Sequence, residues 1–147
     1  MGLVKFRPSS LPILVDASFL VSVYDKQEPY HLQCMAVLDQ VNRPLVTCEP
    51  VVTEAVYLLR RLPGAPQAIL AGIREGQLEV PFQLAHGVNE VLAYYTKYRD
   101  TPADFADACL IAMADKLGTG DILTLDSDFM HYRWRRTRRF RLLVPLE

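Results

Sequence analysis

LPILVD, residues 11–16, is a short run of leucine and β-branched residues that closes on an aspartate. DILTLD, residues 121–126, is a second such run and closes on Asp126. Apolar runs of this length are typical of strands buried in a parallel sheet. The functional crevice of an open α/β sheet lies beyond the carboxyl ends of its strands, so Asp16 and Asp126 are predicted to point toward one rim.

The rest of the chain is predicted to alternate between helices and strands. The helical segments are residues 30–41, 49–62, 63–77, 87–100 and 102–118, and the further strands are residues 44–50, 78–82 and 140–146. Pro50 stands where a first helical turn tolerates it, and Gly118 is a typical helix stop. This alternation predicts a single domain over residues 1–147, of class α/β, with three α/β/α layers around a mostly parallel central sheet.

The composition fits one globular domain. Of the 147 residues, 50% are hydrophobic, which is enough for a full core. No stretch approaches the roughly 20 apolar residues of a membrane span, and residues 1–12 lack the apolar run of a secretory signal, so a cytoplasmic protein without membrane contact is expected. Cys34, Cys48 and Cys109 are widely spaced and are predicted to be reduced core residues.

Two further carboxylates are predicted to face inward from helices. Glu54 belongs to helix 49–62, whose inward stripe is predicted to consist of Val51, Ala55, Leu58 and Leu62. Asp107 lies about one turn inside helix 102–118, on the side that also carries Ile111. A charge on an inward face is costly, so both carboxylates are candidate functional groups.

Asp16, Glu54, Asp107 and Asp126 would therefore converge. At about 5 Å and an effective dielectric near 20, each ionised pair costs on the order of 3 kcal/mol, so the cluster needs protons or a cation. Carboxylates without Cys or His suit Mg²⁺ or Mn²⁺, ions that activate water and neutralise phosphate oxygens. Taken singly, each of these acids is as well explained by a helix cap or a surface salt bridge.

Asp104 admits two interpretations. Its place at the start of helix 102–118 favours a capping residue that also compensates the positive end of the helix. Alternatively, its carboxylate joins the other acids. Both roles are compatible with each other.

Four motifs together resemble the PIN-domain ribonucleases, especially the VapC-like toxins of bacterial and archaeal toxin–antitoxin modules. They are ILVDASFL (13–20), VTEAVYLL (52–59), FADACLIAMAD (105–115) and ILTLDSDF (122–129), and their order and spacing cover most of the chain. The resemblance implies that Asp16, Glu54, Asp107 and Asp126 are the catalytic, metal-holding acids. It also implies supporting roles for Ser18, Thr124 and Asp128, whereas Asp104 stands where related sequences often carry Ser or Thr.

The same resemblance implies a divalent-metal-dependent endoribonuclease that hydrolyses RNA phosphodiester bonds by in-line attack of water. It further implies RNA as substrate, a small antitoxin protein as partner and a homodimer. Two other functions stay open. A metal-dependent phosphatase or phosphotransfer domain is disfavoured because Asp16 does not begin an Asp-x-Asp pattern and no strand-end lysine follows. A non-catalytic RNA-binding PIN domain is disfavoured because all four acidic positions are filled.

The charge of the chain is uneven. Residues 133–147 hold six arginines and one glutamate, although the whole chain has a net charge of −1. The segment RWRRTRRFR, residues 133–141, interleaves arginines with Trp134 and Phe140, a composition that suits phosphate contacts and base stacking. Beside the acidic site, RNA binding is predicted for Arg133, Arg135, Arg136, Arg138 and Arg139. The alternatives are a surface that receives an acidic antitoxin tail, or a solvated turn with Trp134 in the core.

Overall fold

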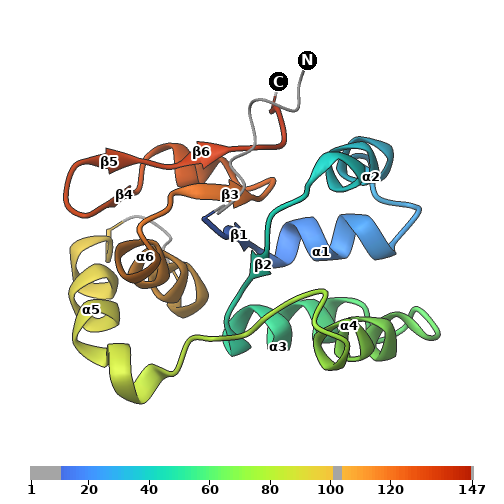
Figure 1. Ribbon diagram of the computed structural model, residues 1–147, viewed down its shortest axis with the longest axis horizontal. Helices are drawn as coiled ribbons and strands as arrows, with labels where there is room; N and C mark the ends of the chain where they lie inside the picture. Colours follow the sequence, from blue (N-terminus) through green and yellow to red (C-terminus); the bar gives the residue numbers. More distant parts are fainter. Residues whose placement is uncertain (1–10, 101–103, 147) are drawn as a thin grey trace.

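A central sheet of four short parallel strands organises the chain. The computed structural model describes residues 11–100 and 104–146. The strands run in the order β2-β1-β3-β6 (Figure 1), and their bounds are β1 (Ile13–Val15), β2 (Leu45–Val46), β3 (Asp121–Leu123) and β6 (Arg141–Leu142). In β1, Leu14 lies opposite Val46 on one side and Ile122 on the other. The predicted parallel sheet is confirmed.

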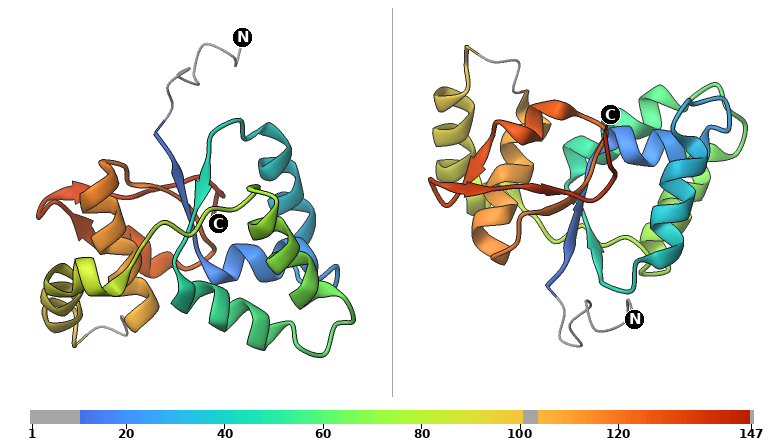
Figure 2. Two further views of the ribbon diagram at one scale, coloured as in Figure 1. Left: turned by 60° about the horizontal axis from the view of Figure 1, so that its bottom comes forward. Right: turned by 90° about the horizontal axis from the view of Figure 1, so that it is seen from above.

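Helices cover both sides of this sheet. Their bounds are α1 (Ala17–Tyr24), α2 (His31–Gln40), α3 (Glu49–Leu58), α4 (Ala65–Arg74), α5 (Leu84–Lys97) and α6 (Phe105–Leu117). Figure 2 shows α5 and α6 on one side of the central strands and α1, α2 and α4 on the other. Between β3 and β6 the chain forms a 3₁₀ helix, η2 (Ser127–Met130), and a hairpin of β4 (Arg133–Trp134) and β5 (Arg138–Arg139). The predicted three-layer α/β/α class is confirmed.

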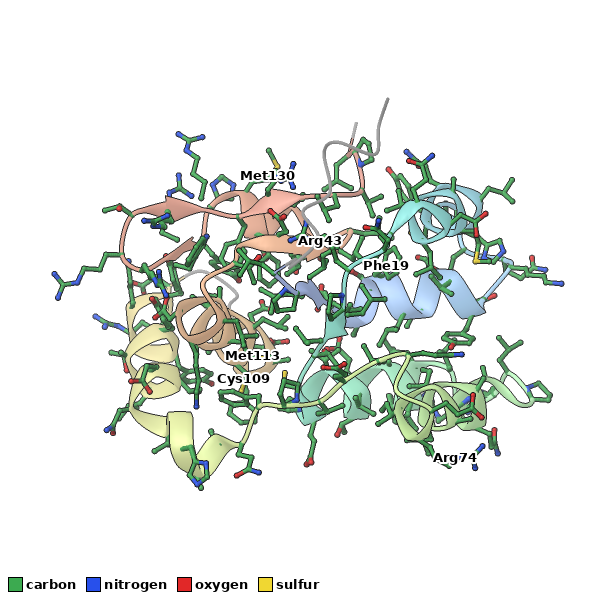
Figure 3. All side chains as sticks on the ribbon, viewed as in Figure 1. Phe19, Arg43, Arg74, Cys109, Met113 and Met130 are labelled. Carbon is green, nitrogen blue, oxygen red and sulfur yellow. The ribbon has the colours of Figure 1, made fainter. Side chains whose placement is uncertain are left out.

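Helix α6 is the most deeply buried helix. Every residue from Ala106 to Ala114 is buried, because the sheet and α5 cover the helix from opposite sides, and α5 with α6 forms an extensive helix pair. Met113 of α6 and Phe19 of α1 lie in the interior, whereas Arg74 lies at the periphery (Figure 3). Helix α6 ends at Gly118, whose φ of 73° is the left-handed cap conformation that favours glycine.

Several predicted boundaries differ from those of the structure. Helix α3 ends at Leu58, four residues before its predicted end, and β3 ends at Leu123, before Thr124 and Asp126. Residues 78–82 contribute a single bridge, Val46 to Glu79, because Pro81 has no N–H with which to extend the ladder. No helix within residues 11–100 and 104–146 is both long and apolar enough to cross a membrane. The three cysteines are free and buried, as predicted.

Candidate active site

An acidic cavity of about 360 Å³ opens beyond the carboxyl ends of β1 and β3. Its lining carboxylates are Asp16, Glu28, Glu54, Asp104, Asp107 and Asp126. No lysine, arginine or histidine of the described residues lines it. The four motif acids, which were expected to converge, thus line one cavity, and Glu28 joins them unpredicted.

Asp16 is held in place by three hydrogen bonds. It is the N-cap of α1, where Oδ1 accepts from the N–H of Ala17 at 2.8 Å. Its Oδ2 accepts from Oγ1 of Thr124 at 2.7 Å and from Oγ of Ser18 at 3.1 Å. Ser18 also accepts from the N–H of Leu125 at 2.9 Å, so the predicted supporting hydroxyls tie the end of β1 to the end of β3. The carboxylate is thereby fixed although it is only 6% exposed.

Asp107 is also only 6% exposed, and its partner comes from a distant part of the chain. Tyr132 donates from its hydroxyl to Oδ2 of Asp107 at 2.9 Å. The tyrosine ring is itself buried and contacts the rings of Tyr98 and Phe129 at centroid distances of 4.9 and 5.0 Å. This aromatic cluster holds the hydroxyl in one orientation, so the position of Asp107 is well defined.

Asp104 caps α6, as its place in the sequence predicted. Its Oδ1 accepts from the N–H of Asp107 at 2.8 Å. The residue is exposed, and it also lines the acidic cavity. The cap therefore places a fifth carboxylate beside the four motif acids.

Asp126 is also a helix cap that lines the acidic cavity. It caps η2 by accepting from the N–H of Asp128 at 2.9 Å, and its own N–H donates to Oγ1 of Thr124 at 3.0 Å. Asp128 is not among the cavity-lining residues. Within the described residues its backbone supports Asp126, while its carboxyl lies outside the cavity wall.

Glu54 differs from its predicted position. The buried face of α3 consists of Val51 and Ala55 and continues to Leu59, whereas Leu58 is 53% exposed. The helix ends at Leu58, and the buried Leu59 is its C-cap. Glu54 is consequently exposed and lies at the rim of the cavity rather than inside the core, so the prediction of an inward face is wrong.

The cavity raises the pKa of its carboxyl groups. Burial is the main cause for Asp107, whose pKa rises to about 8, and the negative charges of Asp104 and Asp16 add to it. Burial likewise raises the pKa of Asp16, of Glu54 and of Asp126, and each also feels at least one neighbouring carboxylate. These acids repel one another, so a cation in the cavity would be stabilised.

The donor set fits a hard divalent cation. Its side chains supply carboxylate and hydroxyl oxygens, the ligands that Mg²⁺ and Mn²⁺ prefer. No three His, Cys, Asp or Glu side chains in the described part of the chain are close enough to form a preassembled metal cluster. The acids therefore surround a cavity rather than a single point.

Comparisons with known proteins bear on this arrangement of acids. The family model described as PIN domain matches residues 13–135, which include all four motif acids. The chain belongs to the PIN domain family. Ribonuclease VapC26 from Mycobacterium tuberculosis is 32% identical over 116 residues, which cover 78% of this chain and 86% of that protein. The crystal structure of VapC20 from the same organism, described as a toxin that cleaves the sarcin–ricin loop, superposes with a TM-score of 0.69 and 22% identity over 79% of this chain and 91% of that one.

The arginine-rich hairpin of this PIN domain is not beside the acidic cavity. The N–H of Arg135 donates to Oδ1 of Asp115 at 2.6 Å, and Asp115 lies two helical turns beyond Asp107, roughly 12 Å along α6. None of the hairpin arginines lines the cavity. The hairpin packs on the carboxyl end of α6, so the predicted neighbourhood of the basic segment and the acidic site is wrong.

Two of the five candidate RNA-binding arginines donate hydrogen bonds through their guanidinium groups, and the guanidinium of Arg138 lies 5.4 Å from the centroid of the Trp134 ring. Arg133 donates to the carbonyls of residues 130–132, and Arg135 donates to the carbonyl of Asp115. The other three guanidinium groups are exposed, with no hydrogen bond or ion pair to any described residue: those of Arg136, Arg138 and Arg139. Trp134 and Phe140 are buried in the core, so they are not available to stack on bases.

Sequence reasoning missed two residues of the site in this PIN domain. Tyr132 lies outside every quoted motif, and only the fold brings it to Asp107, 25 positions away in the chain. Glu28 lies in the turn between α1 and α2, where no periodicity singles out a residue. The available signal for Tyr132 was a second aromatic residue three positions after Phe129.

Proposed function

We propose that this chain is a divalent-metal-dependent endoribonuclease and the toxin of a toxin–antitoxin pair. The observation that carries the proposal is the cavity lined by carboxylates from the end of β1, from α3 and α6 and from the residue before η2, with no cationic side chain of the described residues in its wall. An RNA phosphodiester is an anion, so such a wall repels it unless a cation stands between them. A divalent cation in the cavity would neutralise the carboxylates and allow the phosphodiester to approach them.

Mg²⁺ or Mn²⁺, when bound, neutralises phosphate oxygens and activates water. Asp16, Asp107, Asp126 and Glu54 would hold the cation. Ser18 and Thr124 orient Asp16 through their hydroxyl hydrogen bonds. Glu54 is the most accessible of the four acids, so its carboxylate meets the incoming substrate and solvent first.

The relatives support the choice of substrate and partner. VapC26 is named a ribonuclease, and VapC20 is described as an RNA-loop-cleaving toxin. Because this chain is similar to these proteins, we propose RNA as its substrate and a small antitoxin protein as its partner. A homodimer remains a prediction from the family resemblance.

The test is degradation of a mixed RNA sample with Mn²⁺ by the wild-type chain, by Asp126→Asn and by Asp39→Asn. Asp126→Asn removes one cavity charge at nearly constant shape and should abolish cleavage without unfolding the protein. Asp39 is an exposed residue of α2 outside the cavity, so its neutral variant should cleave like the wild type. Full activity of Asp126→Asn refutes the assignment, and hydrolysis of p-nitrophenyl phosphate without RNA cleavage favours a phosphatase.

A further inference from the structure

A second cavity, of about 880 Å³, adjoins the acidic one. It lies between the first turns of α3 and α6 and residues 82–85, and Cys109 of α6 (Figure 3) forms part of its wall. Glu54 and Asp104 line both cavities. A polymer whose reacting phosphate lies over the acids can therefore continue directly into this second space.

The walls of this cavity suit a flat, uncharged group. Phe82, Leu84 and Phe105 supply apolar and aromatic surface, and no lysine, arginine or histidine of the described chain lines it. Phosphate would find no positive partner there. Its polar lining groups include the carboxylates of Glu49 and Glu54, which accept hydrogen bonds from N–H groups. A nucleobase has both an apolar face and N–H donors at its edge.

Two features shape the aromatic wall. A Cβ on Gly87 would lie 2.8 Å from the Phe82 ring, so the glycine at this position allows the ring to pack against α5. Phe105 is 42% exposed although most of α6 is buried. Phe105 lines this second cavity together with Asp104, which also lines the acidic cavity.

We propose that this second cavity binds an unpaired nucleobase of the RNA next to the scissile phosphate, with the base stacked on Phe105. The inference rests on the proposed ribonuclease function and adds a base subsite to it. Base-to-aromatic stacking tolerates different bases, while the carboxylates of Glu49 and Glu54 favour bases that present N–H groups. Phe105 is thus a binding residue, distinct from the acids that hold the cation.

The experiment compares the affinity of a single-stranded RNA of mixed sequence with that of a tetrahydrofuran–phosphate chain of equal length, which lacks bases. Affinities are measured by fluorescence anisotropy with Ca²⁺ in place of Mn²⁺, so that a hard cation neutralises the carboxylates, and the RNA is checked on a gel to be intact. The proteins are the full-length wild type, Phe105→Ala, Phe105→Tyr and Leu92→Ala. Leu92 is 63% exposed on α5 and does not line the cavity, so its variant is the matched control.

The wild type should bind the base-bearing chain more tightly, and Phe105→Ala should reduce that preference by roughly 5- to 150-fold, the range for one stacked base. Phe105→Tyr keeps the ring and should retain the preference, as should Leu92→Ala. Equal preference in wild type and Phe105→Ala, or no preference in the wild type, overturns the subsite. If the subsite is overturned but the wild type still cleaves RNA with Mn²⁺, the proposed ribonuclease function is retained. If the preference depends on Phe105 but no RNA is cleaved, the base subsite is retained and the ribonuclease function is refuted.

Discussion

Replacing Asp107 by asparagine should change how the stability of the metal-free protein depends on pH. The pKa of Asp107 is raised from 3.8 to about 8. Between these values the folded protein binds a proton that the unfolded chain does not, so stability falls as the pH rises through this window. Asp107→Asn removes the titrating group, while its carboxamide oxygen still accepts the hydrogen bond of Tyr132. The variant should therefore be the more stable protein at pH 9.

The size of the effect follows from the shift. One pKa unit is worth about 1.4 kcal/mol, so the upper bound is on the order of 6 kcal/mol. Water at the open side of the cavity screens the charges, and about 2–4 kcal/mol is a realistic expectation. For a chain of this size that corresponds to roughly 6–12 °C in melting temperature.

The assay is thermal unfolding in EDTA between pH 5 and pH 9 for wild type, Asp107→Asn and Asp104→Asn. Asn caps a helix about as well as Asp, so Asp104→Asn keeps the cap of α6 and removes only a charge that raises the pKa of Asp107. Its pH dependence should be intermediate. If the melting temperatures of wild type and Asp107→Asn fall in parallel across this range, the electrostatic account of the cavity is refuted.

Two further predictions concern residues around the site. Tyr132→Phe keeps the buried ring but removes the hydroxyl that donates to Asp107. Loss of this supporting hydrogen bond should lower the Mn²⁺ affinity measured by calorimetry about 10-fold, while the melting temperature stays nearly unchanged. An unchanged Mn²⁺ affinity would show that Tyr132 serves only in packing. Replacing the three exposed hairpin arginines by glutamine should flatten the slope of log K against log salt for single-stranded RNA by about 2, since each phosphate contact contributes about 0.7. Arg133→Gln should leave that slope unchanged and lower stability, because Arg133 is engaged with backbone carbonyls.

The amino-acid sequence determined the fold class and indicated four of the six carboxylates that line the acidic cavity. Short apolar runs that end on Asp16 and Asp126 specify buried parallel strands, and strand direction brings both ends to one edge. Asp107 follows from helical periodicity, because it lies about one turn inside its helix on the side that also carries Ile111, and both residues are buried. These signals are local, so they can be read from neighbouring residues.

Tertiary structure alone decided the remaining features. The exposure of Glu54 depends on which face of α3 packs against the rest of the protein, because Val51, Ala55 and Leu59 are buried whereas Leu58 is exposed. The hairpin arginines lie near the carboxyl end of α6 because Arg135 bonds to Asp115 and Trp134 fills the space beside Gly120. The hydrogen bond from Tyr132 to Asp107 joins segments that meet only after packing. Contacts between distant segments depend on how whole helices and strands pack against one another. They cannot be predicted from the composition, spacing or periodicity of one segment.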